Sequence, residues 1–82
     1  MAEITVYGAD WCPDCIRTKR ALDAAGAEYV YRDLVAEPEA VAEAEALSGR
    51  KNIPVVVLPD GAILVEPTDP ELRDALERSA SS

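Results

Sequence analysis

The sequence predicts a small α/β protein in which a four-stranded mixed sheet is flanked by helices. Segments that alternate in hydrophobicity, or are apolar throughout, are interleaved with segments whose apolar residues recur every three to four positions. Short turns containing Gly or Pro separate these segments. A length of 82 residues is enough for one modest core but too short for two, so residues 1–82 are expected to form a single domain.

The first half of the chain predicts a strand, a helix and a second strand. Residues 3–7 (EITVY) alternate, with Ile4 and Val6 on one side of a strand. A helix is expected from Pro13 to about Ala25, with Gly26 as its stop signal. Residues 28–34 (EYVYRDL) form the second strand. The inward stripe of the helix is expected to hold Cys15, Thr18, Leu22 and Ala25.

The second half predicts a helix, a hairpin and a last helix. The helix covers about residues 38–48 and ends at Gly49, and the apolar run VVVL (55–58) is typical of a central strand covered on both faces. A PDG turn then leads into AILV (62–65), which completes a hairpin. The last helix begins around Pro70 and has a frayed tail over 79–82. Inward residues are expected to be Val41, Ala44 and Leu47 in the first of these helices, and Leu72, Ala75 and Leu76 in the second.

This element order, β-α-β-α-β-β-α, constrains the sheet. A right-handed crossover makes the first two strands parallel, while the short turn makes the last two antiparallel. Helices are then expected on both faces, and the first strand leads directly into the sequence DWCPDC at a helix N-terminus.

Composition excludes several classes of partner. A net charge of −8 argues against binding nucleic acid, and no run approaches the roughly 20 apolar residues of a membrane span. The start lacks the basic and apolar regions of a secretory signal, so we expect a cytoplasmic protein, and a monomer. Thiols in that compartment stay reduced unless they act as redox groups. The acidic residues Glu37, Glu39, Glu43 and Glu45 are expected to form only a solvated helix face.

The two cysteines, Cys12 and Cys15, admit three interpretations. A structural disulfide closing so short a loop would contribute only about 2 kcal/mol. A zinc site requires four ligands, and the chain has neither His nor a third Cys, so only a metal shared between two copies would remain. A pair of thiols that exchange electrons is the third interpretation, and a CxxC that opens the helix of a βαβ unit favours it.

The residue types in the motif suit thiol chemistry. The thiolate is the nucleophile, and at the first turn of a helix Cys12 can accept hydrogen bonds from unpaired N–H groups. Pro13 suits the first helical position because its missing N–H costs nothing there. Cys15, one turn later, is expected to be less exposed, as a resolving thiol would be.

The sequences ITVYGADWCPDC, NIPVVVLPDG and TDPEL resemble those of glutaredoxins, in family order and over nearly the whole chain. Within that family the chain is most similar to the actinobacterial mycoredoxins. The resemblance implies a thioredoxin-like fold and a thiol–disulfide oxidoreductase, with Cys12 as nucleophile and Cys15 as resolving cysteine. It also implies a cis peptide bond at Ile53-Pro54, where the backbone of Ile53 would pair with substrate.

The resemblance further implies a site for a low-molecular-weight thiol, with no bound cofactor and no metal. Thr68 and Asp69 match the residues that hold the amino-acid end of that thiol, and Lys51 lies in a segment that flanks the same edge. Trp11 is interpreted as a lid beside the sulfur or as part of an apolar face that recognises protein substrates. The basic residues Arg17, Lys19, Arg20, Arg50 and Lys51 are expected to steer carboxylates towards this edge. Each assignment has a simpler alternative: helix caps for Thr68 and Asp69, an exposed ring for Trp11, and charge compensation for the cations.

The chain also departs from the glutaredoxin pattern. A single Gly61 stands where a Gly-Gly pair is usual, which makes mycothiol a better candidate cosubstrate than glutathione. The expected partners are disulfide-containing proteins and small thiols. Two alternatives remain open: a redoxin recharged directly by a flavoprotein reductase of the thioredoxin type, or a module that binds an iron–sulfur cluster between two subunits. Brown, anaerobically purified protein would favour the cluster.

Overall fold

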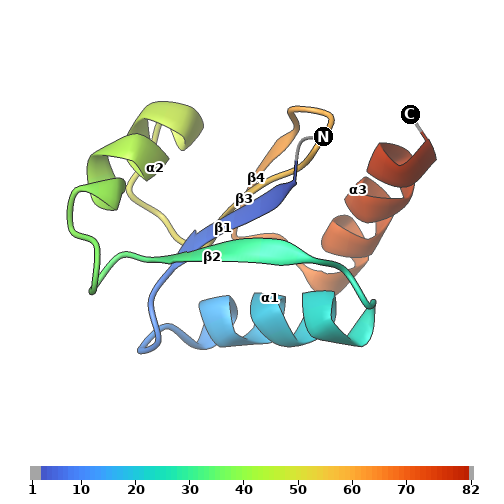
Figure 1. The fold of residues 1–82 in the computed structure, drawn as a ribbon, viewed down its shortest axis with the longest axis horizontal. Coiled ribbons are helices and arrows are strands. Elements are labelled where there is room, and N and C mark those ends of the chain that lie inside the picture. The colour runs from blue at the N-terminus through green and yellow to red at the C-terminus, as the bar shows by residue number, and fades with distance from the viewer. Residues whose placement is uncertain (1–2, 82) are drawn as a thin grey trace.

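The computed structural model describes residues 3–81 and contains the seven predicted elements in the predicted order (Figure 1). The boundaries differ from the predictions by one or two residues, except at the last helix. The elements are β1 (Ile4–Gly8), α1 (Pro13–Ala24), β2 (Tyr29–Asp33), α2 (Ala40–Ser48), β3 (Val55–Val57), β4 (Ile63–Val65) and α3 (Asp69–Ser81).

The sheet has the strand order β2-β1-β3-β4. β1 and β2 are parallel, as a βαβ crossover requires, whereas β3 is antiparallel to both β1 and β4. The predicted mixed topology is therefore confirmed. Because β3 runs opposite to β1, the end of β1 and the start of β3 lie at the same edge of the sheet, where Tyr7 pairs with Val55.

Helices cover both faces of the sheet, as predicted (Figure 1). Leu22 of α1 and Leu72 of α3 share one core with the side chains on one face of β1 and β3. On the other face, α2 packs through two small residues, Ala40 and Ala44, against Tyr7 and Val55. The core residues of the first face are Ile4, Val6, Leu22, Val56, Leu58, Leu72 and Ala75.

The predicted inward residues of α2 were wrong at Val41 and Leu47, which are exposed. The helix begins at Ala40, two residues after the predicted start, and its buried stripe runs through Ala40 and Ala44 at a spacing of four. Small residues on this stripe allow the helix backbone to approach the sheet closely. Periodicity alone favoured the larger apolar residues, although these lie to either side of the stripe.

Two helix ends also differ from prediction. Ala25 is exposed, not inward, because α1 ends at Ala24 and Ala25 is already its C-cap. Gly26 follows with a φ of +70°, a conformation that favours glycine. The tail was expected to fray from Ser79, but α3 continues to Ser81. Ser82 lies outside the described residues.

The acidic stretch does more than face solvent. Glu37 and Glu43 both form ion pairs with Arg32 on β2, at 3.2 and 3.3 Å. The Tyr7 hydroxyl donates a hydrogen bond to Glu43 at 3.0 Å, which ties α2 to β1. Over residues 3–81, no helix combines the length and apolar character needed to cross a membrane.

Candidate active site

The candidate site lies at the edge of the sheet where β1 ends and β3 begins. Beyond β1, residues 9–12 lead into α1. Ile53 and Pro54 directly precede β3, which is the strand that pairs with β1. The Ile53-Pro54 bond is cis, as the resemblance predicted, and the Pro54 side chain is buried. The carbonyl of Pro54 accepts a hydrogen bond from the Glu66 amide at 2.9 Å, so the loop after β4 reaches the same edge.

The two cysteines differ in accessibility. Cys12 is the N-cap of α1 and 7% exposed, whereas Cys15 is 0% exposed in the first turn. Both are free thiols, and Pro13 occupies the first helical position, as predicted. As a free thiol the Cys12 sulfur makes no capping hydrogen bond in the described structure, so acceptance of N–H groups by its thiolate stays a prediction. The carbonyl of Cys12 instead accepts the amide of Ile16 at 3.1 Å.

Burial has a strong effect on the second thiol. Desolvation raises the pKa of Cys15 to about 12, and the neighbouring Cys12 and Asp14 act in the same direction, partly offset by a backbone hydrogen bond from Ala9. Cys15 is therefore protonated at neutral pH. Any reaction in which it acts as a nucleophile has to provide for the loss of that proton.

Gly8 allows the end of β1 to lie directly against Cys15. A Cβ at this position would lie 2.8 Å from the Cys15 sulfur and 3.1 Å from the Tyr31 hydroxyl oxygen. Real Cβ atoms are essentially never found as close as the first distance. The glycine is thus required for close packing of α1 on the sheet, and it brings together the Cys15 sulfur and the Tyr31 hydroxyl.

The N-terminus of α3 lies at the same edge and is closed by its own side chains. The Glu71 amide donates to the Thr68 hydroxyl at 3.3 Å, and the Thr68 amide donates to the Glu71 carboxylate at 2.9 Å. This is a reciprocal capping box, so the predicted capping role of Thr68 is confirmed. The hydrogen bonds from Thr68 lower the pKa of the Glu71 carboxyl.

Arg17 connects the two helix N-termini. Its guanidinium forms ion pairs with Asp14 of α1 at 3.2 Å and Asp69 of α3 at 3.5 Å. It also donates a hydrogen bond to the Pro67 carbonyl at 3.2 Å. We had expected Arg17 to steer carboxylates towards the site. It is instead paired within the protein. Lys19 is likewise engaged, with its ammonium 4.1 Å from the centre of the Tyr31 ring.

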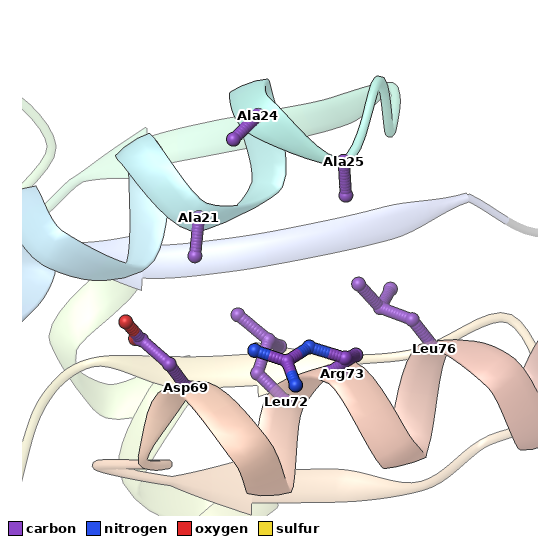
Figure 2. Close-up of a pocket in the computed structure, with 7 residues that line it drawn as sticks. All are labelled: Ala21, Ala24, Ala25, Asp69, Leu72, Arg73 and Leu76. Carbon is purple, nitrogen blue, oxygen red and sulfur yellow. The ribbon is translucent and has the colours of Figure 1, made fainter.

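A hollow of about 330 Å³ lies between α1 and α3 (Figure 2). Figure 2 shows three alanines of the α1 segment facing leucines of α3 across it, with Asp69 at one end. Neither cysteine lines the hollow, although Asp69, a predicted thiol-binding residue, does. Its lining residues are Ala21, Ala24, Ala25, Asp69, Leu72, Arg73 and Leu76.

Comparison with known proteins identifies the family. The family model described as glutaredoxin matches residues 4–63, which is more than half of the chain. Mycoredoxin 1 of Corynebacterium glutamicum is 31% identical over 81 residues, which cover 98% of this chain and 100% of that protein. The chain belongs to the glutaredoxin family. It is a thiol–disulfide oxidoreductase with a thioredoxin-like fold.

A glutaredoxin and a glutaredoxin-like protein are also similar to this chain. A glutaredoxin of Neisseria meningitidis is 39% identical over 59 residues, which cover 71% of this chain and 69% of that protein. The solved structure of the glutaredoxin-like NrdH-redoxin from Escherichia coli has a TM-score of 0.70 and 32% identity, covering 88% of this chain and 93% of that chain. The match to the family model stops before Thr68 and Asp69, so the start of α3 lies beyond it.

The structure of this glutaredoxin-family member brings most of the predicted site residues to one edge. The cysteines, Ile53-Pro54 and the start of α3 all lie there. Trp11 is 71% exposed beside Cys12, Ile53 is half-buried and Lys51 is exposed. Among residues 3–81, no group of three or more His, Cys, Asp or Glu side chains could hold a metal ion.

Sequence reasoning missed three contributors to this edge. The first is Glu71, the partner of Thr68 in the capping box, which the spacing T-x-x-E indicates. Gly8, inside a predicted strand, was a signal of close backbone approach. Nothing in the sequence indicated that the Tyr31 hydroxyl would lie near Cys15, because this depends on how β2 and α1 pack together.

Proposed function

We propose that this protein reduces mixed and protein disulfides through its CPDC dithiol. The Cys12 thiolate attacks one sulfur of the substrate R–S–S–R′, which forms Cys12–S–S–R and releases R′–S⁻, which is then protonated. Cys15 then loses its proton and attacks the Cys12 sulfur. The products are the Cys12–Cys15 disulfide and R–SH. Two electrons pass from the two thiols to the substrate.

The observation that carries this proposal is the inequality of the two thiols. Cys12 is partly accessible at the start of α1, where unpaired amides and the helix dipole favour an anion. Cys15 is fully buried and protonated, so it reacts only after a partner is attached to Cys12. A nucleophile that keeps a small exposed fraction (7%) and a second thiol that is fully buried match the order of the two steps.

The residues around Cys12 supply the proposed substrate contacts. We assign substrate pairing to the backbone of Ile53, which lies next to the buried Pro54 at the edge shared with β1. The exposed ring of Trp11 offers an apolar surface beside the sulfur. Lys51 is a candidate contact for a carboxylate, because it is exposed and has no ion pair with any residue between 3 and 81.

Mycothiol is the proposed cosubstrate in preference to glutathione. The whole-length similarity to mycoredoxin 1 supports this choice. The start of α3 supports it as well, because the Thr68 amide, assigned to the amino-acid end of a small thiol, is already bonded to Glu71. Asp69 is likewise paired with Arg17. An anionic glutathione end would have to displace Glu71 to reach that amide.

A second candidate is recharging by a flavoprotein reductase. The NrdH-redoxin from Escherichia coli, a glutaredoxin-like protein, is described as having a thioredoxin-like activity profile. Its 32% identity over most of both chains makes this donor a specific competitor.

A coupled assay separates these donors. NADPH oxidation is followed with one mixed-disulfide substrate and three recharging systems: mycothiol with its reductase, glutathione with its reductase, and thioredoxin reductase alone. We expect the mycothiol system to give the highest kcat/KM. A faster reaction with thioredoxin reductase alone would instead establish the second candidate. Activity of Cys12→Ser with any donor would refute the proposed chemistry.

A further inference from the structure

The hydroxyl of Tyr31 is a buried polar group that takes no part in the two disulfide-exchange steps proposed above. Its oxygen is inaccessible to solvent and has no hydrogen-bond partner among residues 3–81. Buried hydroxyls normally have a partner, because water is no longer available to them. By contrast, Tyr29 on the same strand donates its hydroxyl to Asp23 at 2.9 Å in an exposed position.

The surroundings of the Tyr31 hydroxyl point to one neighbour. The oxygen and the Cys15 sulfur lie 3.1 and 2.8 Å from the same point, the position of a Cβ on Gly8. Since Gly8 has no side chain, nothing from that residue separates them. On the other side, the Lys19 ammonium lies over the Tyr31 ring. Lys19 is one helical turn after Cys15, so the two residues lie on the same face of α1.

We infer that the Tyr31 hydroxyl donates a hydrogen bond to the Cys15 sulfur when that thiol becomes a thiolate. The inference rests on the proposed role of Cys15 in the second step. A neutral thiol is a weak acceptor, so the hydroxyl has no strong partner in the resting protein. A buried thiolate is a strong acceptor, and a hydrogen bond to a charged group is markedly stronger than one between neutral groups.

The step balances without a change in the protonation of tyrosine. Cys15 loses its proton, its thiolate attacks the Cys12 sulfur of Cys12–S–S–R, and the departing R–S⁻ takes up a proton. Tyr31 keeps its own proton throughout. Burial raises its pKa to about 12, with Cys15 and Asp10 acting in the same direction, so the hydroxyl remains a donor across the neutral range.

The charged groups near Tyr31 and Cys15 determine how much a hydrogen-bond donor can help to form the Cys15 thiolate. Those that face Tyr31 are Cys15, Asp10, Asp33, Cys12 and Lys19. Cys12 and Asp14 oppose a new negative charge on Cys15, while the Lys19 ammonium lies over the Tyr31 ring. A donor at the sulfur itself therefore makes formation of the second thiolate easier.

The test uses reduced protein and the aromatic disulfide 5,5′-dithiobis(2-nitrobenzoate), which releases one coloured thiolate in each step. Attack by Cys12 gives a first phase, and attack by Cys15 on the resulting mixed disulfide gives a second. We expect Tyr31→Phe to slow the second phase at pH 7 by about 10- to 100-fold, the range set by a hydrogen bond to a charged group. The pH profile of that phase moves to higher pH.

Tyr29→Phe is the matched control, because it removes a hydroxyl from the same strand at a site away from Cys15. Both phases should keep their wild-type rates in this variant. The first phase should also change less than twofold in Tyr31→Phe. A second phase with unchanged rate and pH profile in folded Tyr31→Phe would overturn the inference.

Two further outcomes are informative. If wild type itself shows no second phase, or Cys15→Ser retains one, the proposed role of Cys15 fails and the inference fails with it. If Tyr31→Phe does not fold, site-specific 3-fluorotyrosine at position 31 keeps the ring and makes the hydroxyl more acidic. The inference then requires the pH profile of the second phase to move to lower pH, and no movement would refute it.

Discussion

Two helices begin at the same edge of this protein, and their N-termini differ in how they are capped. At α1, the N-cap residue is Cys12, Pro13 follows, and the sulfur makes no capping bond within the described structure. At α3, Thr68 and Glu71 bond to each other's amides. The difference teaches that a helix N-terminus is available to an external anion only when the chain does not fill it. Capping stabilises α3, while α1 leaves its amides open beside a reactive sulfur.

The largest expected effect is the loss of chemistry at the open N-terminus. Cys12→Ser should abolish disulfide exchange, because no accessible nucleophile remains. Cys15→Ser should keep the reduction of small mixed disulfides and weaken that of protein disulfides, which require the second thiol. The two variants are compared with hydroxyethyl disulfide plus a small thiol, and with a disulfide-bonded protein such as insulin. An inactive Cys15→Ser together with an active Cys12→Ser would reverse the roles.

Gly8→Ala tests how closely α1 and its open N-terminus pack on the sheet. The new methyl group would lie 2.8 Å from the Cys15 sulfur, so a core side chain or the helix must shift. Overpacking of this kind costs about 1–3 kcal/mol. Urea unfolding of reduced protein measures the loss. In a Cys15→Ala background the loss should shrink, since the sulfur is gone, and an equal loss in both backgrounds would place the strain elsewhere.

Thr68→Ala removes the cap of the closed N-terminus. We expect a loss of about 1 kcal/mol in the free energy of unfolding, typical of an N-cap hydroxyl. Thr68→Ser retains the hydroxyl and should recover most of this stability. The pair is measured by urea unfolding, and equal stability of the two variants would show that the hydroxyl contributes little.

Arg17→Gln tests the connection between the two N-termini. The ion pairs with Asp14 and Asp69 are about half exposed, so screening leaves a loss of roughly 0.2–1 kcal/mol. Arg20→Gln is the control, because Arg20 is exposed on the same helix without an ion pair inside the described region. The difference between the variants should fall as salt is added. A salt-independent difference would point to packing rather than charge.

The smallest effect concerns pH. Thr68 lowers the folded-state pKa of Glu71, so this carboxylate adds stability above its unfolded pKa of about 4.3. That contribution is lost as the pH falls through the folded pKa. The difference in melting temperature between wild type and Glu71→Gln should therefore be present at pH 7 and vanish in acid.

The fold could be predicted from the sequence because local signals agreed with one another. Alternation in β1, the apolar run of β3 and the glycine after α1 each indicated one element, and the element order predicted the parallel β1–β2 pair and the antiparallel β3–β4 pair. The buried stripe of α2 could not be predicted, since its alanines are buried through close backbone approach rather than through their own hydrophobicity.

The site was predictable where residue chemistry is local and unpredictable where it depends on packing. The CPDC spacing, with Pro13 at a helix start, indicated the thiol pair directly. The ion pair of Arg17 with Asp69 could not be predicted, because Asp69 lies on another helix. The same holds for Tyr31, whose hydroxyl approaches Cys15 only in the folded protein.

The exposed ring of Trp11 has a practical consequence. It is the only tryptophan in the chain, the sequence contains no phenylalanine, and the ring is 71% exposed next to Cys12. Emission excited at the red edge of indole absorption therefore comes from one residue adjacent to the reactive sulfur. We expect thiolate, mixed disulfide and internal disulfide at the neighbouring Cys12 to change this emission to different extents. The unmodified protein would then report its own redox state by fluorescence, free of background from any second indole.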